Sequence, residues 1–520
     1  MVVILWTDGL VFLLLGLILV FAAFASRRPH LSLPWRRVGQ SRSGMISAVI
    51  LICLISVGLL DSFHFRPQIA IDKGKPVYSV EVLSAFDALV KTMRDHTERT
   101  YSSPFSAYAF SKETVVGDGG QSRVYPRLRY GGADLADPDK ERIPDILRRS
   151  FVAALEGIGA WALLAGILVI SLSRGKGFIG TASTVLGGKT EIPWNAMLGT
   201  LLAIFLVAFP AFALSSHYHV FGTDKVGQDV FYLALKSIRT GLVIGTLTTL
   251  VMLPFAIFLG IMAGYLGGWL DDVIQYLYTM LNSIPAVLLI AASVLMMQVY
   301  IDAHPALFET MAERADLRLL FLCMILGMTS WTGLCRLLRG EALRLREMEY
   351  ILAAQAFGVS RLRIVTRHIL PNVMHIVLIS VVMEFSSLVL AEAVLSYVGV
   401  GVDPSMISFG TMINSARLEM AREPMVWWPL AAAFVFMFAM VLSANLFADA
   451  VRDAFDPRTR VASRRILPER DEALTCSNWK ICAPSWRTTE TSCALWTAYP
   501  FPSGRGRLSR FWVNRDAASR

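Results

Sequence analysis

The sequence predicts an all-α membrane protein that crosses the bilayer about nine times, and three observations support this. Of the 520 residues, 55% are hydrophobic and 17% are charged, whereas about a quarter of the residues in soluble domains are charged. The mean hydropathy is +0.53. The apolar residues come in long runs, and a helix needs about 20 of them to cross the hydrocarbon. We expect helices because a lipid-exposed helix satisfies its own backbone groups.

Nine apolar runs are long enough to cross a membrane. They lie near residues 9–26, 44–61, 151–172, 197–215, 240–266, 273–299, 317–335, 373–398 and 427–447. Asp8 precedes the first run, and Arg27 and Arg28 follow it. A secretory signal carries its basic residues before the apolar run. We therefore expect an uncleaved first helix with its N-terminus outside.

The distribution of arginine and lysine predicts the orientation. These residues accumulate in four segments, 27–43, 173–196, 336–372 and 448–465. Nine spans place all four segments on one face, which the positive-inside rule identifies as the cytoplasm. The net charge of +9 therefore indicates topology and lipid contact, with no nucleic-acid partner. We expect a multi-pass protein of the bacterial inner (plasma) membrane.

The order of the spans divides the chain into five parts. We expect an N-terminal transmembrane pair at 1–61, a periplasmic domain at 62–150, an additional pair at 151–215, a core at 216–460 and a cytoplasmic tail at 461–520. Segment 62–150 mixes polar, aromatic and apolar residues, which is typical of a small folded domain. The tail has scattered tryptophans and no period, so we expect it to be poorly ordered.

The loop at 341–372 contains the most informative pattern. Helix formers fill its first half up to Phe357. Gly358 can adopt a positive φ and so ends a helix. A second helix at 361–370 is predicted to end at Pro371, which does not easily continue a helix. The pattern predicts helix, tight turn and helix outside the membrane.

Small side chains in this loop indicate a contact with a partner. Ala353 and Ala354 would let another protein approach closely, while an amphipathic connector lying on anionic lipid is the alternative. Ala353-Ala354-x3-Gly358, followed by Leu370-Pro371, resembles the EAA loop of ABC-importer permeases, although Leu352 stands where that motif has Glu. In that family the loop holds a coupling helix that inserts into a groove on the ATPase subunit. The resemblance implies an ATPase-coupling site at Glu349, Ala353, Ala354, Gly358, Arg361, Leu370 and Pro371.

Other strings resemble the dipeptide/oligopeptide branch of this family. The string HVFGTDKVGQDV at 219–230 matches a segment that precedes the core spans, with Phe221 and Gln228 as departures. Further matches lie at 264–271, 283–285, 395–401 and 452–458. The local chemistry of Asp224 and Asp229 favours a turn and a helix cap over a substrate site. The resemblance covers about 216–460, and relatives have one span before the Gly-Thr-Asp string where this chain has four.

The resemblance implies a type I ABC-importer transmembrane domain, preceded here by an extra N-terminal periplasmic segment. The implied function is a permease subunit that imports peptides of the dipeptide/oligopeptide class. The implied partners are a second homologous permease subunit, two cytoplasmic ATPase subunits and a periplasmic substrate-binding protein. ATP would bind to the ATPase subunits, and no cofactor is expected in this chain. Nickel, opine or antimicrobial peptide transport are the alternatives within the family.

Residues for catalysis, metal binding or cofactor binding are not evident. Gly187-Gly188-Lys189-Thr190 resembles part of a phosphate loop, but Ser183 stands where that motif needs glycine. The cysteines lack the paired spacing of a zinc site. Neither an HExxH nor a GxSxG motif occurs. We therefore expect no enzyme, while a membrane enzyme or receptor that uses 62–150 is the remaining alternative.

Two carboxylates lie within one apolar run. Glu384 and Glu392 are eight residues apart, so they point about 80° apart around a helix. Carboxylates in a bilayer are costly and usually functional. Both are candidates for the translocation path or gating, and a hydrogen bond between helices is the alternative.

Overall fold

The computed structural model describes residues 2–27, 29–72, 75–79, 81–117, 120–173, 177–188, 190–304 and 310–455. The described residues belong to one compact unit, Met1–Asp456. The tail predicted at 461–520 lies outside the described residues.

Nine helices of the described chain are long and apolar enough to cross a membrane. Eight are α1 (Trp6–Ser26), α3 (Arg42–Asp61), α6 (Pro138–Leu172), α8 (Trp194–Ser215), α9 (Val230–Leu266), α11 (Ala286–Ala303), α12 (Met311–Arg346) and α17 (Trp428–Phe455). The ninth consists of α14 (Arg361–Ile364), the π-helical turn η2 (Val365–Ile369) and α15 (Leu370–Val398). The predicted all-α polytopic class is confirmed.

Shorter elements connect these helices. The helices are α2 (Pro29–Gln40), α4 (Ala85–Leu89), α5 (Lys91–Asp95), α7 (Phe178–Leu186), α10 (Gly268–Ser283), α13 (Glu349–Ala356) and α16 (Phe409–Glu419). The strands are β1 (Val2–Val3), β2 (His64–Phe65), β3 (Gln68–Asp72), β4 (Lys75–Tyr78), β5 (Leu83–Ser84), β6 (Glu113–Gly117) and β7 (Gly120–Val124). All their pairings are antiparallel: β1-β2-β5, β3-β4 and β6-β7.

The start of the span predicted at 273–299 is wrong, because the chain forms two helices there and only the second, Ala286–Ala303, is long and apolar enough to cross a membrane. Helix α10 ends at Ser283, Ile284 is extended (φ −91°, ψ 131°), and α11 begins after Pro285. A proline disfavours helical backbone at the residue before it. Apolar composition alone does not reveal this break, because Ile284 and Pro285 leave the run hydrophobic.

The helix end predicted at Pro371 is also wrong. The chain stays helical from α14 through η2 into α15, where Pro371 occupies the first turn. The N–H of Leu370 donates to the carbonyl of Val365, five residues back. Proline lacks an N–H and normally clashes with the carbonyl four residues before it. We infer that the wider π-turn accommodates the ring.

Helices α9 and α12 form the centre of the packing. Gly260 and Gly264 of α9 lie directly against α12, where a Cβ on Gly264 would collide with the carbonyl oxygen of Arg339. Leu338 and Ala342 of α12 are fully buried in the same cluster. Glycines four residues apart let two membrane helices approach closely. Helices α1, α3, α10, α15, α16 and α17 also contact α9.

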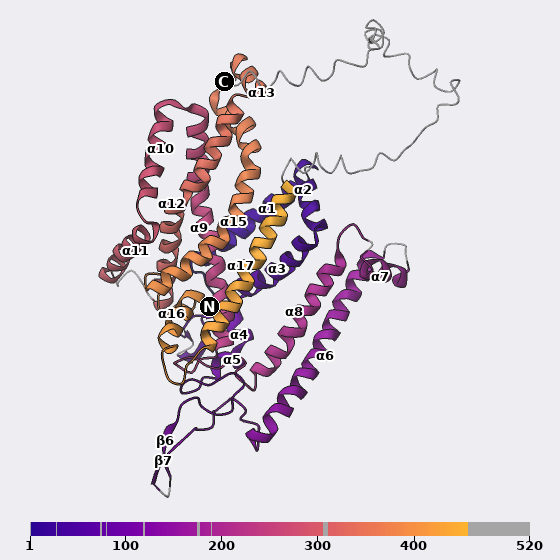
Figure 1. Cartoon of the computed structure of the whole chain (residues 1–520), viewed down its shortest axis with the longest axis vertical. Helices are drawn as coiled ribbons and strands as arrows, with labels where there is room; N and C mark the ends of the chain where they lie inside the picture. The colour runs from indigo at the N-terminus through magenta and orange to yellow at the C-terminus, as the bar shows by residue number, and fades with distance from the viewer. Residues whose placement is uncertain are drawn as a thin grey trace, which may run out of the picture. The chain divides into compact units, whose positions relative to one another are not determined.

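The N-terminal helices divide into a packed pair and a peripheral pair. Helix α1 contacts α9 and α12, and α3 contacts α9, α17 and α8. Asp8 of α1 accepts hydrogen bonds from Arg239 of α9 (2.6 Å) and bonds to His64 Nδ1 (2.7 Å). The contact with His64 helps to offset the cost of burying the Asp8–Arg239 ion pair. By contrast, α6 packs mainly on α7 and α8, at one side of the bundle (Figure 1).

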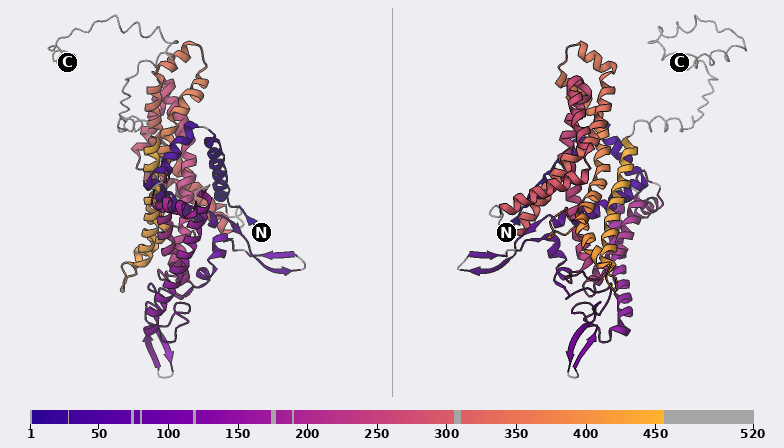
Figure 2. Two further views of the ribbon diagram at one scale, coloured as in Figure 1. Left: turned by 90° about the vertical axis from the view of Figure 1, so that its right-hand side faces the viewer. Right: turned by 60° about the vertical axis from the view of Figure 1, so that its left-hand side comes forward.

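Segment 62–137 packs onto the other helices. Its buried side chains Phe86, Val90, Met93 and Tyr101 belong to the same cluster as residues of α9, α16 and α17. Helix α6 already begins at Pro138, inside the predicted domain 62–150. Two hairpins, β3-β4 and β6-β7, project from this segment (Figure 2).

The connecting elements gather at two ends of the bundle. Figure 1 shows α13 at one end of the bundle and β6-β7 at the other, with α16 nearer the β6-β7 end, while α2 and α7 lie at the upper ends of the helices that they connect. We call the α13 end the elbow end and the β6-β7 end the outer end. The described residues of the four basic segments lie in or next to α2, α7, α13 and the last turn of α17.

Candidate functional site: an exposed elbow and an outer clamp

The elbow is the turn from α13 to α14, and a glycine defines its shape. Gly358 has φ +73° and follows the last helical residues of α13. Its N–H donates to the carbonyl of Gln355 (2.9 Å), and the N–H of Val359 donates to that of Ala354 (3.1 Å). This pair of bonds is a Schellman motif, which normally needs glycine at the left-handed position. The helix-turn-helix predicted from the sequence is present here.

Buried isoleucines fasten the elbow to the helices beneath it. Ile351, Ile364 and Ile369 are completely buried and pack in the cluster that contains Leu338 and Ala342 of α12. The side chain of Asn372 also donates to the hydroxyl of Tyr350 (3.0 Å), which ties α15 to α13. The elbow is therefore packed on α12 and bonded to α15.

The opposite side of the elbow is open to contact. Glu349, Ala353, Gly358, Arg361 and Pro371 are exposed. Ala354 and Leu370 are half-buried within the cluster below.

Two further exposed residues of the elbow were missed in the sequence analysis. Phe357 is 87% exposed and Leu362 is 75% exposed, on either side of the Gly358 turn. Large apolar side chains are rarely presented to water in this way without a partner. The position of these residues directly beside the predicted glycine turn could have revealed them.

A charged strut supports the elbow end. Arg339 of α12 donates to both carboxylate oxygens of Asp271 in α10 (2.6 and 2.7 Å). This hydrogen bond lowers the pKa of Asp271. Asp271 ends the string at 264–271, and its paired hydrogen bonds with Arg339 join α10 to α12.

A buried charge cluster, which we call the outer clamp, lies at the outer end. It consists of Glu98, His219 and Asp229. His219 Nδ1 lies 2.8 Å from Asp229 Oδ2, and its Nε2 lies 3.5 Å from Glu98 Oε1. Glu98 also accepts backbone N–H bonds from residues 129, 130 and 131, at 2.9, 2.7 and 3.2 Å. All three side chains are at most 4% exposed.

The outer clamp is charged at neutral pH. Burial lowers the pKa of His219, but the contacts with Asp229 and Glu98 outweigh burial and raise it to about 9. Burial likewise opposes ionisation of Glu98, but His219 and the three backbone donors lower its pKa to about 2. An imidazolium between two carboxylates therefore joins segment 62–137 to the start of α9.

Backbone contacts extend the clamp along the string at 219–230. Thr223 donates its N–H to the carbonyl of Ser102 (3.1 Å), and its hydroxyl accepts from the N–H of Ser102 (2.7 Å). The N–H of Glu98 donates to the carbonyl of Gly227 (2.9 Å), where a Cβ would collide with Glu98. Asp229 caps α9 through the N–H of Phe231 (2.8 Å). The helix cap favoured from the sequence is present.

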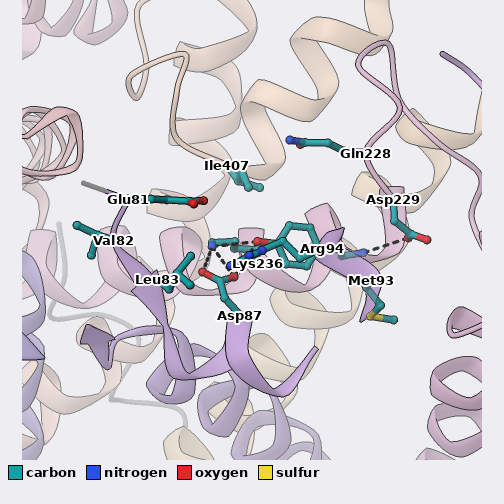
Figure 3. A pocket seen from close by; sticks show the side chains of 11 residues that line it. Glu81, Val82, Leu83, Asp87, Met93, Arg94, Gln228, Asp229, Lys236 and Ile407 are labelled. Carbon is teal, nitrogen blue, oxygen red and sulfur yellow. Dashed lines mark hydrogen bonds and ion pairs between the residues drawn. The ribbon is translucent and has the colours of Figure 1, made fainter. Parts of the chain in front are cut away.

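A small cavity of about 150 Å³ lies between segment 62–137 and α9 (Figure 3). Lys236 crosses it to Asp87 with two contacts of 2.7 Å, and Tyr232 donates to the same carboxylate (2.7 Å). Ligand pockets usually occupy roughly 300–1,000 Å³. The size and the internal ion pair indicate a structural joint.

The two candidate carboxylates of α15 have different surroundings. Glu392 is buried and accepts hydrogen bonds from Ser396 (2.7 Å) and from Ser408 (2.9 Å), the N-cap residue of α16. Glu384 is half-buried and accepts from Ser387 (3.0 Å). Glu392 therefore makes the interhelix contact that was the alternative to a gating role. No hydrogen bond among the described residues joins the two carboxylates.

The nine long apolar helices of the described chain define it as an integral membrane protein. The sequence model described as "Binding-protein-dependent transport system inner membrane component" matches residues 256–461. A relative that is 31% identical to this chain, and is covered over 79% of its own length, shows that the chain belongs to this family. The family resemblance predicted from the sequence and the inner-membrane location are confirmed.

Three relatives illustrate the similarity. The oligopeptide transport system permease protein OppC of Mycobacterium tuberculosis (strain ATCC 25618 / H37Rv) is 31% identical over 248 residues, which cover 48% of this chain and 79% of OppC. The dipeptide transport system permease protein DppC of Bacillus subtilis (strain 168) is 28% identical, with 46% and 69% covered. The OppC protein of the same strain is 27% identical, with 51% and 86% covered.

Proposed function

We propose that this chain is a permease subunit of an ABC importer for peptides, and that the elbow couples it to an ATPase. The observation that carries the proposal is the elbow, whose exposed Phe357 and Leu362 flank a left-handed glycine. Relatives named as oligopeptide and dipeptide permeases support the choice of peptides over nickel complexes or opines.

The proposed mechanism follows from the way the elbow is fastened. Two ATPase subunits would bind ATP and close, and each would move the elbow docked in its groove. Ile351 and Ile364 are buried against α12, so this movement would tilt α12 and α15 as rigid elements. The path between this chain and a second permease subunit would then alternate between inward and outward access.

The remaining roles follow from the same proposal. A periplasmic binding protein would deliver the peptide at the outer end, and this chain would need no cofactor of its own. Glu384, half-buried on α15, is proposed to lie near the translocation path. Glu392 is proposed to influence gating only through its contact with α16.

Peptide uptake tests the proposed function directly. A strain that lacks this chain is expected to lose uptake of a labelled tripeptide, because the permease pair would be incomplete. Plasmid-borne wild-type chain should restore it. The result that contradicts the proposal is unchanged peptide uptake together with lost uptake of nickel or of an opine.

A cysteine at position 353 is expected to cross-link to a soluble ATPase subunit. Ala353 is exposed on the elbow, so a short thiol cross-linker should reach the groove of the docked protein. The control is Met425→Cys, which is exposed at the outer end. Equal capture from both positions, or from position 425 alone, would rule out docking at the elbow.

A further inference from the structure

Helix α6 carries a carboxylate within its apolar part. Glu156 is exposed and lies five residues after Phe151, where the apolar run begins. At 1.5 Å per residue it lies roughly 8 Å inside the run. No hydrogen bond or ion pair reaches Glu156 from the described residues. Ionisable side chains inside a membrane are costly and are usually paired.

Glu156 lies in an open stripe of α6. On a helix with 3.6 residues per turn, positions 152, 159, 163 and 167 fall within about 60° of position 156. Val152, Leu163 and Ile167 are exposed. A Cβ on Gly159 would meet no atom within 4 Å. We call these four residues and Glu156 the Glu156 face.

The packing of α6 on α8 fixes where this face points. Gly157 lies against Phe205 and Phe209 of α8. The indole N–H of Trp161 donates to the carbonyl of Leu198 (2.8 Å). Since α6 packs mainly on α7 and α8, the Glu156 face is directed away from the rest of the chain. Figure 1 shows α6 at the margin of the bundle.

The chemistry of the Glu156 face selects one kind of partner. A glycine within an apolar stripe lets a second helix approach closely, and the carboxylate requires a donor at the same depth. Lipid tails offer none, and two-fold pairing with a second copy would bring two carboxylates together. We propose that the Glu156 face binds a transmembrane helix of a different protein, which carries a lysine or arginine opposite Glu156. This interaction does not depend on the proposed transport function.

Site-specific photo-cross-linking in native membranes tests the proposal. A benzophenone side chain at position 163 or 167 is expected to capture one membrane protein. Ile158 is the matched control, because it is exposed but lies about 160° from Glu156 around the helix. The adduct should be lost in Glu156→Ala and largely kept in Glu156→Gln. Membrane levels of each variant are followed by immunoblot, so that loss of the chain is not mistaken for loss of binding.

A charge exchange separates specific pairing from simple proximity. Glu156→Lys should abolish the adduct, and replacing the basic residue of the captured helix by glutamate should restore it. Adducts with lipid only or with a second copy of this chain would overturn the proposal. An adduct that persists in both Glu156→Ala and Glu156→Lys would also overturn the proposal.

Discussion

Replacing Gly358 by valine is expected to reduce ATP-driven uptake strongly while the chain remains in the membrane. Gly358 has φ +73° and faces open space, so the effect comes from the backbone and not from a clash. The left-handed conformation costs L-residues roughly 1–2 kcal/mol, and more for a β-branched side chain. The Schellman bonds would open and the elbow would change direction. We expect uptake to fall about tenfold or more, measured with a labelled peptide in membrane vesicles that contain the partner subunits.

Two control variants isolate the role of the elbow. Gly358→Asn should retain most uptake, because asparagine tolerates the left-handed region. Gly399→Val introduces the same strain at the outer end, where Gly399 has φ +88° and also faces open space. A Gly358→Val chain that transports normally, or a loss no greater than that in Gly399→Val, would contradict the coupling role.

Replacing Glu98 by alanine is expected to release the outer clamp. The change leaves the imidazolium of His219 with one carboxylate and removes the acceptor of three backbone N–H groups. Removing one partner of a buried ion pair costs about 3–5 kcal/mol. Hydrogen exchange across residues 96–132 should therefore accelerate strongly, with little change in α12. The control is Glu113→Ala, which loses only a 3.7 Å contact with the exposed Arg99.

The pH dependence of the same exchange tests the charges of the clamp. The His219 pKa is raised from 6.5 to about 9, so its contribution is full below pH 6.5 and is lost as pH rises through 9. The Glu98 pKa is lowered from 4.5 to about 2, so its contribution is full above pH 4.5 and is lost as pH falls through 2. Protection should be greatest between these limits. Protection that increases steadily from pH 6 to pH 9 would refute a charged His219.

The elbow was largely predictable because it is a local structure. The position of Gly358 and the helix formers before it determine the turn through contacts within a few residues. The break at Pro285 and the continuation through Pro371 were not predicted correctly. At Pro285 the helix breaks before the ring, whereas at Pro371 the preceding turn widens into a π-turn and the helix continues. Apolar composition does not distinguish these two outcomes.

The sequence by itself determined the membrane class, the number of spans and the glycine turn, because these depend on local composition and local backbone preference. Only the tertiary structure showed that segment 62–137 is fastened to the start of α9. Glu98 and His219 are 121 residues apart, and neither residue lies in a local sequence pattern that predicts the other as its partner. Their pairing depends on which buried charges meet once the helices have packed, and the free energy of burying a charge is defined only when its partners are in place.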